Sequence, residues 1–355
     1  MTIAGAGRKF RPRFHIRAGW RAGGAATHTP RMQIPVTFRR IILAATMALS
    51  LADANAAPVP TGEPAGETIE LWPGGAPGGA RVTVKEELLE RQSTGPLRDR
   101  IVQHTTRPLI TIFPARGKPN GVTLLIVPGG GYQRVVIDKE GFEAAEWFTQ
   151  RGFAAAVLRY RLPADGWAAG ADAPVHDAMR AMRLLRQLPA PKGSPAPRIG
   201  AIGYSAGGHL VARLITEPSL AYPRRDGADD LEARPDFAVL MYPVIHTTGE
   251  YAHAGSAGQL VAGGVTAEDL ARYSPDRNVS ASTPRTLLVH AADDATVAVE
   301  NSQRMYDALR KAGIRSELHV FDRGGHGFGL RSIAGRTVAI WPTLVENWAL
   351  NETPP

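Results

Sequence analysis

Short apolar runs alternate with segments of helical spacing along most of the chain. Runs rich in Val, Ile, Leu and Ala predict buried strands at 68–72, 109–113, 122–127, 153–160, 199–204, 237–244, 285–291 and 318–321. Apolar residues recurring on one helical face predict helices at 140–151, 174–188, 206–216, 299–312 and 337–350. Strands separated by helix-length segments indicate an α/β fold, with a mostly parallel central sheet and helices on both faces.

One connection in this pattern is longer than the others. Residues 246–284 lie between two predicted strands and exceed the length of an ordinary connection. We interpret this segment as a short insertion, and as a candidate lid or substrate-recognition element. Active groups of such sheets lie on loops at the carboxyl ends of the strands, so the loops that follow the strands are the positions where chemistry is expected.

The composition narrows the chemistry and the partners. The 355-residue chain contains no cysteine, which excludes disulfides, a thiolate nucleophile and cysteine-based zinc sites. Its net charge of +8 comes from the N-terminus, because residues 1–40 hold nine basic and no acidic residues and the chain from Ala57 onward is neutral overall. The basic excess therefore does not indicate nucleic acid as a partner. No H-E-x-x-H or similar ligand cluster is present, so we expect no metal and no other cofactor.

The N-terminal region has the pattern of an export signal. A basic pair at 39–40 precedes an apolar run at 41–52, and Ala-Asn-Ala at 54–56 fits an A-x-A cleavage site. The apolar run is too short to span a bilayer as a stable helix, so we expect no stable membrane insertion after the signal is removed. Either Met1 or Met32 fits as the start of translation.

These boundaries give a simple domain organisation. We assign residues 1–56 to an N-terminal extension with a secretory signal peptide, 57–66 to a Pro/Gly-rich linker, and 67–350 to a single catalytic domain. The expected localisation is outside the cytoplasm, either periplasmic or extracellular.

A sharp turn carries the candidate nucleophile. The motif Gly203-Tyr204-Ser205-Ala206-Gly207 fits G-x-S-x-G and lies between a predicted strand and a predicted helix. A serine on such a turn has its hydroxyl exposed at the edge of the sheet, which is the geometry of a nucleophile elbow. The motif alone also fits an ordinary strand-to-helix turn, so its weight comes from the groups that accompany it.

A glycine-rich loop, Pro128-Gly129-Gly130-Gly131-Tyr132, follows the strand at 122–127. Ester hydrolysis forms an oxyanion that needs fixed N–H donors, and glycine lets the backbone approach the substrate closely. We assign Gly130, Gly131 and the amide of Ala206 as oxyanion-hole donors, and the choice of glycines stays open by one position. The alternatives are a flexible loop or a phosphate-binding loop, but no G-K-[S/T] follows.

The candidate acid and base follow the serine in the order that a triad requires. Asp293 and Asp294 come after a predicted strand, and the pattern H-x-x-x-D-x-x-V selects Asp294 as the acid and leaves Asp293 as a turn residue. Both aspartates would be turn formers in the alternative interpretation. His326 follows the last strand between glycines, which makes it the candidate base and completes the order Ser205, Asp294, His326. Three other histidines are interpreted as structural: His176, His209 and His290.

The chain contains seven short motifs in this order: PGGGY (128–132), YRLP (160–163), GYSAGGH (203–209), RPDF (234–237), YPVI (242–245), DD-x-x-V (293–297) and GGHGFG (324–329). In this combination the chain resembles secreted, acetylxylan-esterase-like carbohydrate acetyl esterases of the α/β-hydrolase superfamily, near its acetyl esterase/lipase and prolyl-oligopeptidase-like branch. The resemblance covers about residues 69–348. It implies the α/β-hydrolase fold and the same roles for Ser205, Asp294 and His326. The chain departs from the pattern at Ala291, where many members have glycine.

The motifs and the resemblance together predict a serine esterase. It would hydrolyse acetyl esters on plant-type polysaccharides or oligosaccharides through an acyl-enzyme intermediate, with an acetylated carbohydrate or a small ester as its partner. The alternatives are a broad short-chain carboxylesterase, an exopeptidase, or a catalytically inactive binding module. The sequence leaves open the natural substrate, the acyl length and the oligomeric state.

Overall fold

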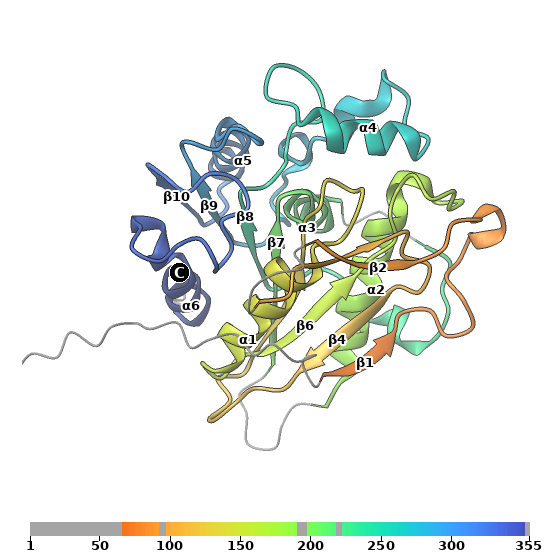
Figure 1. The fold of residues 1–355 in the computed structure, drawn as a ribbon, viewed down its shortest axis with the longest axis horizontal. Helices are drawn as coiled ribbons and strands as arrows, with labels where there is room; N and C mark the ends of the chain where they lie inside the picture. The colour runs from red at the N-terminus through yellow and green to blue at the C-terminus, as the bar shows by residue number, and fades with distance from the viewer. Residues whose placement is uncertain (1–65, 92–96, 190–196, 218–221, 352–355) are drawn as a thin grey trace, which may run out of the picture. The chain divides into compact units, whose positions relative to one another are not determined.

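The computed structural model describes residues 66–91, 97–189, 197–217 and 222–351 (Figure 1). The chain divides into two units, Met1–Ala56 and Ala57–Pro355, and all of the described residues belong to the second. The expected signal peptide and nearly all of the expected linker lie outside the described residues, so both stay predictions. Within the described ranges, no helix is long and apolar enough to cross a membrane.

An eight-stranded sheet forms the centre of this unit, in the order β1-β4-β6-β5-β7-β8-β9-β10. Its strands are β1 (Glu67–Glu70), β4 (Leu109–Phe113), β5 (Val122–Val127), β6 (Ala154–Arg159), β7 (Arg198–Tyr204), β8 (Phe237–Met241), β9 (Thr286–Ala291) and β10 (Ser316–Phe321). Strand β4 runs antiparallel to both of its neighbours, whereas every neighbouring pair from β6 to β10 is parallel. The mostly parallel α/β sheet expected from the sequence is confirmed.

The described residues form six α-helices, and all but the one in the expected insertion pack against the sheet as the alternating pattern predicts. They are α1 (Glu143–Thr149), α2 (Ala173–Gln187), α3 (Ala206–Thr216), α4 (Ala254–Ala262), α5 (Glu300–Lys311) and α6 (Trp341–Leu350). Helix α1 contacts β6, α3 contacts β7 and β8, and α5 contacts β9 and β10. Helix α2 packs against α3, and Phe148 in α1 meets Trp341 in α6 edge to face. The helices α2 and α3 thus form one group and α1 and α6 another (Figure 1).

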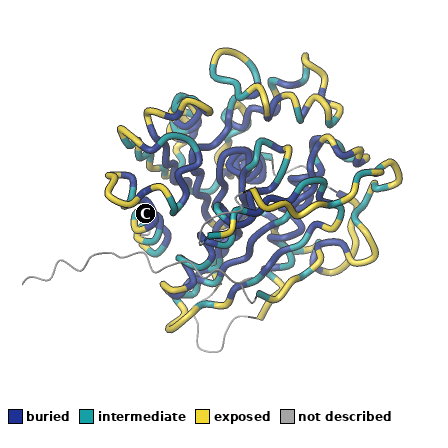
Figure 2. Tube along the Cα trace, in the orientation of Figure 1, coloured by how far each residue is buried: buried dark blue, intermediate teal, exposed yellow. Residues whose placement is uncertain are grey.

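The central strands form the core of the molecule (Figure 2). Every residue of β8 and β9 is buried, and β5 and β7 each contain a single residue that is only partly buried. Strands that are covered on both faces need apolar side chains on both faces, which explains their continuous apolar sequence. The loops that leave the carboxyl ends of these strands therefore start from a rigid base.

Two short strands have no counterpart in the sequence prediction. Strands β2 (Glu87–Glu90) and β3 (Arg100–Gln103) form a separate antiparallel pair. Each has polar residues at both ends, so the apolar pattern does not identify it. Val102 in β3 also pairs with Val135, which places β3 beside the segment that follows the glycine-rich loop.

Three predicted elements differ from the structure by more than two residues at one end, among them the helix predicted at 337–350, which begins as a 3-10 turn, Thr337–Ile340, before α6. The helix predicted at 140–151 is preceded by a π-helical turn, Ile137–Phe142, and α1 starts only after it. Strand β8 ends earlier than predicted, because Tyr242 has a φ of 36° and a proline follows it. The expected insertion at 246–284 contains α4 and two short 3-10 turns.

Candidate active site

Ser205 lies on the sharp turn between β7 and α3. Its φ of 52° and ψ of −118° are strained for any residue that has a side chain. The glycines of the motif permit this turn: a Cβ on Gly207 would lie 2.2 Å from the carbonyl oxygen of Val127, and one on Gly203 would lie 2.3 Å from that of Gly207. The Ser205 amide donates to the carbonyl of Met241 at 2.9 Å. The turn is therefore fixed against the ends of two neighbouring strands, β5 and β8.

The structure brings Ser205, His326 and Asp294 into one hydrogen-bonded line. Nε2 of His326 lies 2.9 Å from Oγ of Ser205, and Nδ1 lies 2.7 Å from Oδ2 of Asp294. The Asp294 side chain is fully buried, whereas the His326 side chain is 20% exposed. This is the arrangement of a nucleophile, a base that can take its proton, and a carboxylate that orients the base.

Several groups hold Asp294 in place. Its Oδ1 accepts the amides of Thr296 and Val297, each at 2.9 Å, and its Oδ2 lies 3.3 Å from Nε2 of buried His290. Burial alone would raise the pKa of Asp294, but the hydrogen bonds from His290 and His326 together lower it well below its usual range. Asp294 is therefore ionised at neutral pH, as a group that stabilises an imidazolium must be.

Asp293 has a different place from its neighbour. Its Oδ1 accepts the amides of Gly324 and Gly325 at 2.8 and 2.7 Å, in the loop that carries His326. These backbone hydrogen bonds lower the pKa of Asp293. The two adjacent aspartates thus act on different parts of the same loop: Asp294 contacts the imidazole, and Asp293 holds the backbone that precedes it.

The glycine-rich loop lies beside Ser205. A Cβ on Gly129 would lie 2.9 Å from Cβ of Ser205, and the Gly129 amide donates to the Glu140 carboxylate at 2.8 Å, so it is engaged away from substrate. Gly130 and Gly131 follow with φ values of 130° and 65°. Among the described residues, neither of their amides nor that of Ala206 donates to another group. The oxyanion-hole assignment of Gly130, Gly131 and Ala206 stays a prediction, with Gly129 the glycine that fits it least.

His209 connects the glycine-rich loop to the insertion. Its Nδ1 lies 2.8 Å from the hydroxyl of Tyr132, and its Nε2 lies 2.7 Å from the carbonyl oxygen of Tyr273. Burial and the nearby Arg213 lower the pKa of His209 to about 3, so the ring is neutral. Nε2 therefore donates to Tyr273, and Nδ1 accepts from Tyr132. The role is structural, and it joins the loop at 128–132 to the inserted segment.

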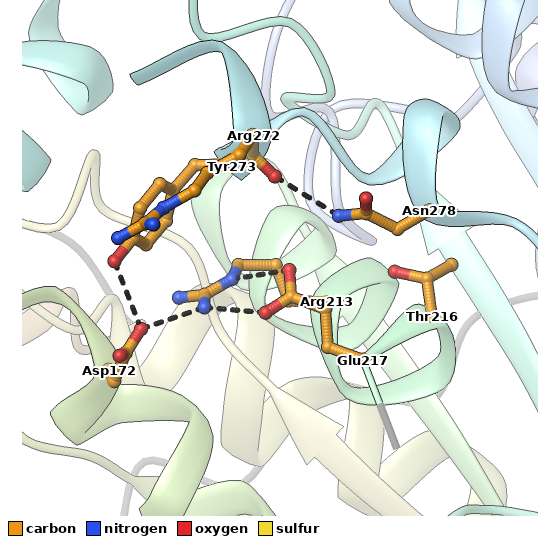
Figure 3. Close-up of a pocket in the computed structure, with 7 residues that line it drawn as sticks. All are labelled: Asp172, Arg213, Thr216, Glu217, Arg272, Tyr273 and Asn278. Atoms are coloured by element: carbon orange, nitrogen blue, oxygen red, sulfur yellow. Dashed lines mark hydrogen bonds and ion pairs between the residues drawn. The ribbon is translucent and has the colours of Figure 1, made fainter. Parts of the chain in front are cut away.

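A polar cleft of about 440 Å³ lies at the other end of α3 (Figure 3). Arg213 spans it, donating to Asp172 at 2.8 Å and to Glu217 at 2.7 Å. Its lining residues are Asp172, Arg213, Thr216, Glu217, Arg272, Tyr273 and Asn278. None of them belongs to the triad, and the side chains of Asp172, Arg213, Glu217 and Tyr273 are hydrogen-bonded to one another. The hydrogen-bonded line at Ser205 is therefore the candidate active site.

Sequence reasoning missed two residues next to the triad. Glu140 lies beneath the glycine-rich loop, and Tyr242, at the end of β8, meets the His326 ring edge to face with centroids 5.2 Å apart. Glu140 stands at a predicted helix start. Tyr242 opens the YPVI motif but lies inside a predicted strand, so the sequence pattern assigns neither residue to the site. Among the described residues, no group of three acidic, histidine or cysteine side chains is placed to hold a metal ion.

A family model described as the prolyl oligopeptidase family matches residues 143–339, more than half of the chain. The chain belongs to this family. The matched range contains the whole hydrogen-bonded line, from Ser205 through Asp294 to His326, and the glycine-rich loop precedes it.

Two curated relatives of this family member match over part of their length. Endo-1,4-beta-xylanase B of Butyrivibrio fibrisolvens is 34% identical over 204 residues, which is 58% of this chain and 32% of that protein. Acetylxylan esterase of Xylanibacter ruminicola is 32% identical over 215 residues, 59% of this chain and 42% of that protein. The chain thus spans well under half the length of these two relatives.

Solved structures share the fold over most of the described unit. An acetyl ester-xyloside bifunctional hydrolase from Caldicellulosiruptor lactoaceticus is 32% identical, with a TM-score of 0.62, over 82% of this chain and 97% of that chain. Esterase 2 of Thermogutta terrifontis, with a TM-score of 0.55 and 24% identity over 75% of this chain and 94% of that chain, is similar in fold. The α/β-hydrolase fold expected from the resemblance is confirmed.

Proposed function

We propose that this prolyl oligopeptidase family member is a serine esterase that removes acetyl groups from plant-type polysaccharides or oligosaccharides of the acetylxylan type. The observation that carries the proposal is the unbroken line from Asp294 through His326 to Ser205, at 2.7 and 2.9 Å. The names of the relatives supply the substrate class: one is an acetylxylan esterase, and a solved structure is an acetyl ester-xyloside hydrolase.

The reaction proceeds in two steps. Ser205 Oγ attacks the ester carbonyl while His326 Nε2 takes its proton, and the oxyanion lies against the amides of Gly130, Gly131 and Ala206. Collapse of this intermediate breaks the bond to the alcohol, which leaves with the proton from His326. Water then attacks the acetyl-Ser205 ester by the same route and releases acetate. Asp294 stabilises the imidazolium in both steps.

The same proposal includes export of the protein from the cytoplasm and removal of residues 1–56 as a signal peptide. An esterase that acts on plant polysaccharide must meet its polymer outside the cytoplasm, and the segment 1–56 has the pattern of a signal peptide that delivers the catalytic domain there. Fractionation of the producing cells tests this: the activity and a chain that starts near Ala57 should leave the cytoplasm together. A full-length chain that stays in the cytoplasm would contradict it.

The test of function is acetate release from acetylated xylan, beside hydrolysis of p-nitrophenyl acetate, with Ser205→Ala as the control. We expect the wild type to act on both substrates and the variant to lose at least about 10³-fold in kcat. Activity on the small ester alone would indicate a broad short-chain carboxylesterase. Cleavage of aminoacyl p-nitroanilides without ester cleavage would indicate a peptidase. A wild type that no fluorophosphonate probe labels would be a binding module.

A further inference from the structure

Glu140 is a buried carboxylate in the π-helical turn that follows the glycine-rich loop. Only 5% of the residue is exposed. Its Oε2 accepts the amide of Gly129 at 2.8 Å, and its Oε1 accepts the hydroxyl of Tyr242 at 3.0 Å. Turns of π-helix inside or beside α-helices occur frequently at functional sites, so this position invites a functional explanation.

The two partners of Glu140 flank Ser205 in the strand order, because Gly129 follows β5 and Tyr242 follows β8, on either side of β7. Gly129 is the residue before the candidate oxyanion donors, and it lies so close to Ser205 that a Cβ built on it would be 2.9 Å from Cβ of Ser205. Tyr242 stands at the end of β8, with its ring edge to face with the His326 imidazole. A Cβ built on Gly327, the residue after His326, would lie 3.7 Å from Oε1 of Glu140. The carboxylate thus joins the glycine-rich loop to Tyr242 at the end of β8, and the Tyr242 ring in turn packs against His326 and Phe328 of the base loop.

The chemistry of the two contacts requires a carboxylate. Both partners are donors, and burial raises the pKa of Tyr242 well above its usual range, so its hydroxyl keeps its proton. An ionised carboxylate only accepts, and hydrogen bonds to it are stronger than those between neutral groups. Within the described ranges, no Lys or Arg forms an ion pair with Glu140, and each of its two oxygens accepts from one of these donors. A glutamine would turn its NH₂ group toward one of the two donors.

We propose that Glu140 is a positioning residue for the esterase reaction: it holds the oxyanion loop and the base loop in register around Ser205. The inference rests on the proposed function. It predicts that the Glu140 carboxylate affects the transition state, in which the amides of Gly130 and Gly131 are used, more than the binding of the ground-state ester. A loss of function at Glu140 should therefore appear in kcat and not in KM.

Glu140→Gln tests this, with Glu143→Gln as the matched control. Both residues are buried and both changes are the same. Glu143 pairs with Arg331, five residues after His326, and within the described ranges it hydrogen-bonds to neither the glycine-rich loop nor Tyr242, which are the partners of Glu140. With p-nitrophenyl acetate at neutral pH we expect Glu140→Gln to lower kcat about 100-fold, with KM within about twofold, as for loss of an oxyanion donor. The control should keep kcat within about twofold of the wild type.

Tyr242→Phe provides a second, independent measurement. It removes the donor at Oε1 and should lower kcat about tenfold. In the double variant the glutamine NH₂ no longer faces a hydroxyl donor, so the double variant should be no slower than Glu140→Gln alone. If Glu140→Gln does not fold, Tyr242→Phe decides, and an unchanged kcat overturns the proposal.

The outcomes separate this proposal from the function on which it rests. If the wild type has no esterase activity, the proposed function is refuted, whatever the variants show. If the wild type is active and the folded Glu140→Gln variant keeps kcat within about threefold, only the positioning role is refuted. The same holds if the variant raises KM and leaves kcat unchanged.

Discussion

The Asp294–His326 contact makes a sharp prediction for Asp294→Asn. In the wild type, Asp294 Oδ2 accepts the Nδ1–H of His326 at 2.7 Å, which leaves Nε2 without a proton and able to take one from Ser205. The asparagine oxygen can keep the two bonds from the amides of Thr296 and Val297. Its NH₂ group then faces His326, so Nδ1 must accept and the proton moves to Nε2, where it faces the serine.

The size of the effect follows from these changes. The variant has the wrong tautomer and no charge to stabilise the imidazolium, and the same exchange in the serine-protease triad lowers kcat about 10⁴-fold. That loss corresponds to about 5.5 kcal/mol of transition-state stabilisation. The fold should survive, because the asparagine is isosteric and keeps the Oδ1 bonds. His290, whose Nε2 lies 3.3 Å from Oδ2, still donates to the carbonyl of Val297 at 3.0 Å.

The assay compares kcat for p-nitrophenyl acetate in Asp294→Asn and Asp293→Asn. Asp293 has the same side chain one residue earlier, but it accepts only the amides of Gly324 and Gly325, and an asparagine oxygen can accept both. We expect Asp293→Asn to stay within about 0.5 kcal/mol, or about twofold, of the wild type. The reasoning is refuted if Asp294→Asn keeps more than about a tenth of the wild-type kcat, or if Asp293→Asn is the more damaged variant.

Two further predictions concern stability. Asp177 and Arg161 form a multidentate ion pair whose side chains are both fully buried, so Asp177→Ala should lower the free energy of unfolding by about 3–5 kcal/mol; a loss below about 1 kcal/mol in urea titrations would contradict this. Burial raises the pKa of Glu143 from 4.5 to about 7, against the opposing effect of Arg331. The raised pKa of Glu143 therefore adds to the free energy of unfolding at low pH, and this contribution, on the order of 3 kcal/mol, is complete below about pH 4.5. It is lost as the pH rises from there through about 7, because the folded protein must then release the proton of Glu143. Melting curves from about pH 5 to about pH 8 should show a steeper decline for the wild type than for Glu143→Gln, and parallel curves would exclude the shift.

The apolar pattern predicts the large elements well because their burial is nearly complete. Strands 109–113 and 122–127 and the helix 206–216 have the predicted boundaries. The pattern fails at β2 and β3, which have polar residues at their ends and form their own small sheet; β2 is exposed, whereas β3 is mostly buried. Their position depends on contacts such as that of Val102 with Val135, which no local pattern carries.

The candidate site likewise contains residues that the sequence pattern predicts and residues that it does not. Ser205 and His326 lie on turns with special backbone requirements, and glycines at fixed offsets mark these turns in the sequence. Asp294 has no flanking glycine and is marked by its spacing from His290 and Val297. The sequence pattern also separates Asp294 from Asp293, and the structure places only Asp294 against His326. Glu140 leaves no comparable mark. Its importance depends on two donors, one near in sequence and the other, Tyr242, 102 residues away.

The order of the strands explains why these distant residues meet. Neighbours in the sheet run β5-β7-β8-β9-β10, and each contributes one component at its carboxyl end: the glycine-rich loop, Ser205, Tyr242, Asp294 and His326. Parallel strands place these ends side by side, so the sheet alone sets the sequence of groups across the site. It does not fix the loops to one another to within the fraction of an ångström that proton transfer needs. Residues that bridge the loops must do so: Asp293 for the base loop, and Glu140, which comes from the crossover between β5 and β6, for the loops on either side of Ser205.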